Sequence, residues 1–136
     1  MTQRLGLPAT QNVAVGAVTA SGRVMTFQNA VTVSSIIAVW VATATIGNRT
    51  VQVQIKDSAG NIYLRLPLAA AIVASATANI VAVSGQAIAN FAGPPIVQTV
   101  PLPFDMPLPA GATITVVDTA NIDATDTCSI NCLFSY

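Results

Sequence analysis

Side chains with hard oxygen ligands form one cluster in this 136-residue chain. The cluster consists of Asp118, Asn121, Asp123 and Asp126. A calcium ion would take about six to eight oxygens from such a loop, but the spacing follows no EF-hand pattern. Aspartate and asparagine are also ordinary turn residues. We therefore expect a polar turn between two strands, with no metal bound.

The two cysteines, Cys128 and Cys132, lie four residues apart in a segment that alternates like a strand. Four residues of strand separate Cα atoms by about 13 Å, whereas a disulfide tolerates at most roughly 7 Å. The sequence thus predicts two free, buried thiols, which suits folding in a reducing compartment. A zinc site is not expected, because there is no histidine and no third cysteine.

Catalytic constellations are not evident in the sequence. The five carboxylates are scattered, no nucleophile has a neighbouring base, and no glycine-rich phosphate loop exists. Lys56 lies at the tip of a predicted hairpin. We therefore predict a protein that is not an enzyme and that has no catalytic, cofactor-binding or metal residues.

Charge excludes further classes of partner. Five basic and five acidic side chains give a net charge of zero, and 53% of the residues are hydrophobic. Such a chain has no basic patch for nucleic acid and no polybasic segment for a lipid surface. Residues 1–7 have neither a basic region nor an apolar run, so no secretory signal is predicted. A neutral, apolar chain tends to associate, which favours a homo-oligomer.

The clearest element is a β-hairpin over Arg49–Leu66. Apolar and polar residues alternate on both sides of a turn at Asp57–Asn61, with the period of two that a half-buried strand requires. The apolar set is Val51, Val53, Ile55, Ile62, Leu64 and Leu66. Both halves can therefore lie on the same face of one sheet.

Further strands are predicted from alternation and turn residues. They are Gln11–Ala20, Arg23–Phe27, Val31–Ile46, Thr77–Val83, Ile96–Leu102, Ala112–Val117 and Thr127–Tyr136. Gly16 is expected to mark a bulge or a close approach of backbones. In the last strand Phe134 and Tyr136 share one face with the cysteines, and we expect both rings to be buried. The chain is predicted to be an all-β, two-sheet antiparallel sandwich of about eight strands, with residues 1–10 as a flexible arm and 11–136 as one domain.

The segment Val31–Ile46 is apolar on both faces between Ile36 and Val41. Such a strand is expected to be buried on both sides. The second cover could come from the same chain, which is the interpretation we favour, or from another subunit. On either alternative Trp40 is buried, in the core or in an interface.

Residues 67–84 are rich in alanine, and no charge lies between Arg65 and Asp105. A membrane-spanning helix is disfavoured because Ser75, Thr77 and Asn79 interrupt the apolar run. We expect an irregular or short helical piece over Ala69–Ser75, followed by the Thr77–Val83 strand.

Residues 86–109 contain six prolines, at positions 94, 95, 101, 103, 107 and 109. Proline donates no hydrogen bond to a sheet, so the segment predicts a long loop with one edge-like strand. A proline ligand for a recognition module is disfavoured, since the prolines alternate with residues that a folded domain would bury.

Two stretches resemble a known class of proteins. They are I-G-N-R-T-V-Q-V-Q-I-K-D-S-A-G-N-I-Y-L-R from Ile46 and P-L-P-A-G-A-T-I-T-V-V-D-T-A-N-I-D-A-T-D from Pro107. Both are similar to small virion proteins of tailed bacteriophages, namely jelly-roll decoration or cement proteins and related head components. The resemblance covers about Ile46–Asp126. It implies a jelly-roll-like sandwich that binds the major capsid protein lattice on the outer surface of the head and stabilises the shell.

The same resemblance implies a virion location after synthesis in the host cytoplasm, and we expect a homotrimer with residues 1–10 as a foothold on the shell. The alternative is a carbohydrate-binding or host-attachment module of a phage tail or fibre, because jelly rolls also serve as lectins. That role usually needs exposed aromatics, and Trp40, Phe134 and Tyr136 are expected to be buried. A metal-binding cupin enzyme is disfavoured by the absence of histidine.

Overall fold

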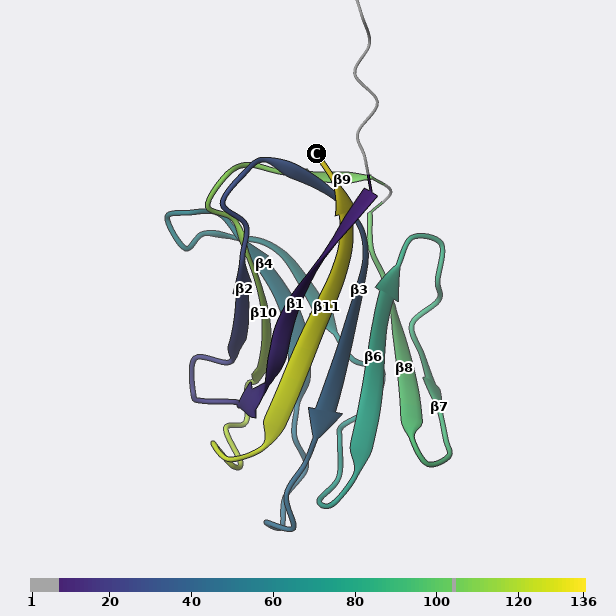
Figure 1. The fold of residues 1–136 in the computed structure, drawn as a ribbon. Coiled ribbons are helices and arrows are strands. Elements are labelled where there is room, and N and C mark those ends of the chain that lie inside the picture. The colour runs from purple at the N-terminus through teal and green to yellow at the C-terminus, as the bar shows by residue number, and fades with distance from the viewer. Residues whose placement is uncertain (1–7, 104) are drawn as a thin grey trace, which may run out of the picture.

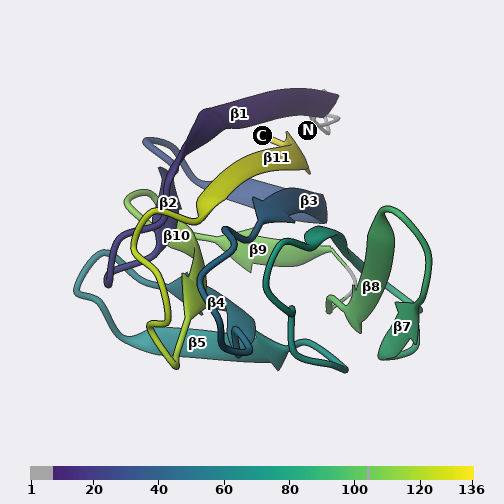
Figure 2. The ribbon, with the colours of Figure 1, turned by 90° about the horizontal axis from the view of Figure 1, so that it is seen from below.

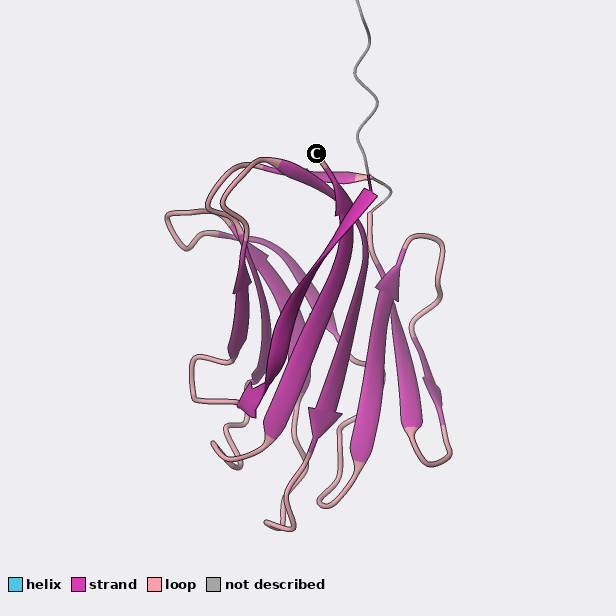
Figure 3. Ribbon diagram, viewed as in Figure 1, coloured by secondary structure: helices cyan, strands magenta, loops and turns pink. Residues whose placement is uncertain are grey.

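A computed structural model describes residues 8–103 and 105–136, which form strands and loops without a helix (Figures 1 and 3). The strands are β1 (Pro8–Ala17), β2 (Arg23–Thr26), β3 (Val31–Val41), β4 (Val51–Lys56), β5 (Ile62–Pro67), β6 (Thr77–Val83), β7 (Ala89–Phe91), β8 (Ile96–Pro101), β9 (Met106–Leu108), β10 (Thr113–Asp118) and β11 (Thr127–Ser135). The all-β prediction is confirmed, with eleven strands in the described residues instead of about eight.

The strands form two sheets that face each other (Figure 2). The large sheet has the order β1-β11-β3-β6-β8-β7, and β9 pairs with the first part of β3. The small sheet has the order β2-β10-β4-β5. All pairings are antiparallel except that of β6 with β8, which is parallel. The arrangement is sandwich-like, as predicted.

The core lies between the sheets and follows the period of two in the sequence. Val53 and Ile55 from the small sheet and Ile80 and Ile130 from the large sheet are at most 1% exposed. The predicted hairpin is confirmed as β4 and β5, with Val53 opposite Leu66. Ile62 departs from the predicted apolar face, because a register shift places it opposite Lys56 and leaves it 39% exposed. Its turn is held by the Asp57 carboxylate, which accepts hydrogen bonds from three donors within Ala59–Asn61.

β3 is buried on one face only. Ile36 and Trp40 point into the core and are at most 1% exposed, whereas Ile37 and Val41 on the other face are 45% and 41% exposed. The prediction that this chain covers both faces is therefore wrong for the described residues. Trp40 is a core residue.

β8 corrects the interpretation of the proline-rich segment. It lies inside the large sheet, between β6 and β7, and not at an edge. Pro101 is its last residue, so the missing N–H interrupts no further pairing. The predicted loop also contains β7 and β9, each three residues long.

No helix forms over residues 69–75. The backbone N–H and C=O of Ala70 are both bonded to the side chain of Gln98, at 3.0 and 2.9 Å. Ile72 is fully buried and exchanges two backbone hydrogen bonds with Arg49. These contacts take the groups that a helix would pair internally. The next strand, β6, has the predicted bounds. No helix in the described ranges is long and apolar enough to cross a membrane.

The bulge expected at Gly16 is confirmed, and what approaches this glycine closely is a side chain instead of a backbone. The pairing of β1 with β11 shifts register between Val13 and Gly16. A Cβ atom at Gly16 would lie 2.5 Å from the Arg23 guanidinium, which donates to the carbonyl of Ala14. Of the predicted arm, residues 1–7 lie outside the described residues, and residues 8–10 belong to β1.

β11 places Cys128, Cys132 and Phe134 in the core, as predicted, together with Ile130. Tyr136 follows the last strand residue and is 64% exposed, so its predicted burial is wrong. Both cysteines are free and buried, as predicted.

Burial raises the pKa of both thiols to about 12, so the reactive thiolate is scarce at neutral pH. We predict that Ellman's reagent reacts slowly with the folded protein at pH 8 and reports two thiols per chain in denaturant, without reductant. Fast reaction of the folded protein, or a disulfide found by mass spectrometry, would contradict the buried strand.

Candidate functional site

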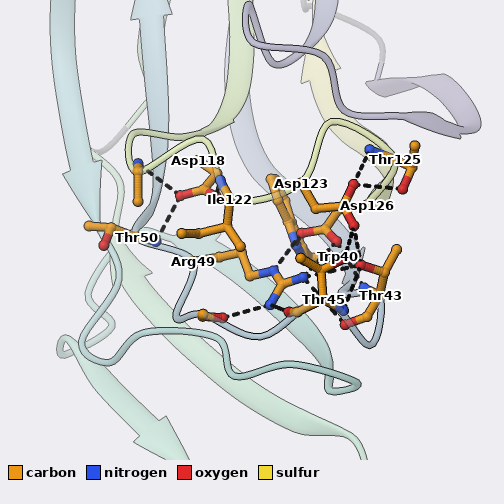
Figure 4. Close-up of polar contacts among 12 residues, drawn as sticks. Trp40, Thr43, Thr45, Arg49, Thr50, Asp118, Ile122, Asp123, Thr125 and Asp126 are labelled. Carbon is orange, nitrogen blue, oxygen red and sulfur yellow. Dashed lines mark hydrogen bonds and ion pairs between the residues drawn. The ribbon is translucent and has the colours of Figure 1, made fainter.

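The strongest concentration of polar groups lies where β3 and β10 end and β4 and β11 begin (Figure 4). Two loops meet there, residues 42–50 and 119–126. They bring together Asp123 and Asp126 of the predicted oxygen cluster with Arg49, which the sequence placed only at the start of a hairpin.

Arg49 and Asp126 form a fully buried ion pair, in which both side chains are 0% exposed. Nε of Arg49 donates to Oδ2 of Asp126 at 2.8 Å, and Nη2 donates to Oδ1 at 3.2 Å. Nη1 donates to the carbonyls of Thr45 and Gly47 at 2.8 and 2.6 Å. Nη2 also reaches the carbonyl and hydroxyl oxygens of Thr43. The guanidinium therefore has partners for all five of its N–H groups.

The Asp126 carboxylate has further donors. Oδ2 accepts from Nε1 of Trp40 at 3.2 Å, and Oδ1 accepts from the backbone N–H of Thr43 at 2.8 Å. Burial alone would raise the pKa of Asp126, but the hydrogen bonds and charge of Arg49, with the Thr43 and Trp40 donors, hold this pKa below its usual value. The hydrogen bond to Asp126 likewise raises the pKa of Arg49. Both groups are ionised at neutral pH.

Asp123 binds the same loop from its exposed side. Oδ1 accepts from the hydroxyl and the backbone N–H of Thr125, and Oδ2 accepts from the hydroxyls of Thr43 and Thr45. These bonds, that of the Thr125 hydroxyl first, lower the pKa of Asp123 well below its usual value. The Thr43 hydroxyl connects Asp123 to the Arg49–Asp126 ion pair, because it donates to Asp123 and accepts from Arg49.

Asp118, at the end of β10, is separate from this pair. Its carboxylate accepts from the backbone N–H groups of Thr50, Ala120 and Ile122 at 2.9, 3.0 and 2.9 Å. It thus closes its own turn and fixes the start of β4. Asn121 occupies the left-handed backbone conformation of that turn, with φ of 50°.

The predicted cluster is therefore three aspartates whose carboxylates each accept hydrogen bonds from protein donors, together with one turn residue, Asn121. Within the part of the chain that the structure describes, no three acidic, cysteine or histidine residues are grouped to hold a metal. A cation would have to displace N–H and O–H donors from every carboxylate. Chemically, the arrangement fastens two loops to the ends of four strands.

Sequence reasoning missed Arg49, Trp40, Thr43 and Thr45 as members of the cluster. A signal was present for the arginine, because Arg49 is the only charged residue between Arg23 and Lys56. A lone charge in so apolar a segment calls for a buried partner. Nothing in the spacing identifies that partner, which lies 77 residues away.

Lys56 lines a hollow of about 470 Å³ on the outside of the small sheet. Asp118 and Asn121 also contribute to this hollow, so it combines one cation with a carboxylate already bonded to the backbone. A larger hollow of about 720 Å³ lies between Ser75–Thr77 and Gly93–Ile96, and no charged side chain lines it.

We predict that Asp126→Asn lowers the free energy of unfolding by about 3–5 kcal/mol, because it leaves the Arg49 charge buried without a counter-ion. Urea denaturation followed by tryptophan fluorescence measures this. The matched control is Asp105→Asn, which removes an exposed carboxylate and should cost less than about 0.5 kcal/mol. A loss below about 1 kcal/mol for Asp126→Asn would show that the ion pair contributes little.

Acid should weaken the same cluster. The pKa values of Asp123 and Asp126 are lowered in the folded protein, so their stabilisation is complete above the unfolded value of about 3.9. It is lost as pH falls through the folded values. With no histidine in the chain, unfolding free energy should stay nearly flat between about pH 5 and pH 8 and then fall. Asp126→Asn should show a smaller fall than the parent, and an equal fall would contradict the assignment.

Comparison with models of protein families, with curated proteins and with solved structures finds no match to this chain.

Proposed function

We propose that this chain is a structural virion protein, a decoration protein that binds the outer surface of a tailed-phage capsid and stabilises the shell. In this proposal the sandwich is a jelly roll and acts as a homotrimer. Its partner is the lattice of the major capsid protein, which it meets after synthesis in the host cytoplasm. One observation carries the proposal: the exposed face of the large sheet.

This outer face consists of the side chains of β11, β3, β6, β8 and β7 that point away from the core. Its exposed apolar members are Ile37, Val41, Phe91 and Leu133, which are 45%, 41%, 57% and 41% exposed. Half-buried valines lie between them at positions 39, 81, 83 and 97. The same face also carries polar side chains, among them Ser35, Asn79, Ser129 and Asn131. Exposed apolar residues in a surface without charge are typical of the central part of a protein interface.

Charge is segregated between the two sheets. None of the seven strands in the large sheet contains a charged residue, whereas the small sheet contains Arg23, Lys56, Arg65 and Asp118. Copies that meet through the outer face would bury no unpaired charge. The small sheet would remain in contact with water. The segregation therefore favours assembly through the large sheet.

Symmetry connects assembly to shell binding. A closed homo-oligomer buries the same patch on each copy. It also presents several identical contacts to a symmetric lattice, and effective concentration combines these weak contacts into firm attachment. A trimer suits positions of threefold symmetry, where three capsid subunits meet.

The two stretches that resemble virion proteins are adjacent in space, which supports treating them as one unit. The first contains β4 and most of β5, and the second contains most of β9 and the whole of β10. β10 pairs with β4 along its whole length. The Arg49–Asp126 ion pair joins the two stretches at one end.

We predict that the parent protein sediments as a trimer and binds capsid shells that lack it, and that Ile37→Asp gives a folded monomer that no longer binds. Analytical ultracentrifugation and co-sedimentation with shells measure both effects. The control is Tyr63→Asp, which places the same charge at a 53% exposed position of the small sheet and should leave the trimer intact.

A parent monomer that decorates shells fully would contradict the oligomer. Electron microscopy of virions tests the role as a decoration protein independently of the oligomeric state, because a decoration protein appears as regular protrusions at lattice symmetry positions. A location confined to the tail would contradict the proposed function itself.

A further inference from the structure

A small hollow lies beside the connection from β2 to β3 and the end of β11. These segments are at the opposite end of the sandwich from the loops of the ion pair (Figure 1). We call the hollow beside them the terminal hollow. Its volume is about 270 Å³, near the lower limit of about 300 Å³ for small-molecule sites. Its lining includes the side chains of Gln11, Phe27, Gln28, Asn29, Phe134 and Tyr136.

The polar side chains of this lining are uncharged: the carboxamides of Gln11, Gln28 and Asn29 and the hydroxyls of Thr26 and Tyr136. Nε2 of Gln11 donates to the carbonyl of Thr26 at 2.9 Å, which leaves its Oε1 as an acceptor. Gln28 and Asn29 are exposed. A carboxamide offers donors and acceptors together, as a hydroxyl group does. With no charged side chain in the lining, the terminal hollow favours a neutral ligand rich in hydroxyls over an anion or a cation.

The apolar part of the lining ends in an exposed ring. Phe27 and Phe134 are buried and meet edge to face, with ring centroids 5.4 Å apart. Phe134 meets Tyr136 in the same way, also at 5.4 Å, and Tyr136 is 64% exposed. The buried rings thus orient the exposed one. The face of an aromatic ring carries negative potential, which attracts the C–H groups on one side of a sugar ring.

We propose that the terminal hollow binds a neutral saccharide residue. The pyranose ring stacks on Tyr136, and its hydroxyls bond to the carboxamides of Gln28 and Asn29 and to Oε1 of Gln11. A site of this size binds one sugar with about millimolar affinity. Attachment to a glycan surface would then depend on many copies acting together. This activity goes beyond shell binding and does not depend on it.

The test is a titration of the full chain with single sugars. Binding is measured by saturation-transfer difference NMR and by the chemical shifts of the backbone amides. The probes are the methyl glycosides of glucose, galactose and mannose, together with N-acetylglucosamine. Glucuronate is the charged comparison. At least one neutral probe should bind at millimolar concentration, shift the amide signals of Gln28 and Asn29, and bind more tightly than glucuronate.

Variants separate stacking from other contacts. Tyr136→Ala should weaken binding at least about tenfold, whereas Tyr136→Phe keeps the ring and should stay within about threefold. The matched control is Tyr63→Ala, at an exposed tyrosine of the small sheet, which should change nothing. Amide spectra confirm that each variant is folded. The proposal is overturned if no neutral probe binds, if binding survives Tyr136→Ala, or if glucuronate binds best.

Discussion

The Arg49–Asp126 ion pair is the constraint on which one end of this sandwich depends. Removing two charges from water costs several kcal/mol per ion, which is a large fraction of the stability of a domain of this size. The structure offsets the cost with complete pairing, because every N–H of the guanidinium has an acceptor and both carboxylate oxygens have two donors. A partly paired version would be less stable than an apolar contact.

The ion pair lies at the end of the sandwich where the chain passes between the large and the small sheet, from β3 to β4 and from β10 to β11. Trp40 ends the buried part of β3 in the large sheet, Arg49 precedes β4 in the small sheet, and Asp126 precedes β11 in the large sheet. Hydrogen bonds in fixed directions allow one arrangement. That arrangement sets where β4 and β11 begin and therefore which faces they bury.

Local alternation made much of this fold predictable. The bounds of β6, the inward faces of β4 and β11, and the bulge at Gly16 all follow from short-range patterns and side-chain size. Three-residue strands such as β7 and β9 are too short to show a period. The parallel pairing of β6 with β8 depends on a contact between segments that are separate in the sequence. Prolines near the ends of β8 led to its prediction as an edge strand. Ala70 lies in no helix because Gln98, 28 residues away, bonds both of its backbone groups.

The contacts of the polar residues were harder still to predict from local patterns in the sequence. The aspartates were identifiable as turn residues, and the structure gives them that role, but their donors come from a loop about 80 residues earlier. Tyr136 continues the alternation of a buried strand, yet the strand stops one residue before it. Alternation alone did not reveal that this ring is 64% exposed. The same ending leaves a ring beside three carboxamides, at the end of the molecule where no charged side chain lines the hollow. The ion pair, the outer face of the large sheet and the terminal hollow thus lie on separate parts of the molecule. In the proposed assembly, contacts between copies through the outer face would therefore leave the terminal hollow open to a sugar.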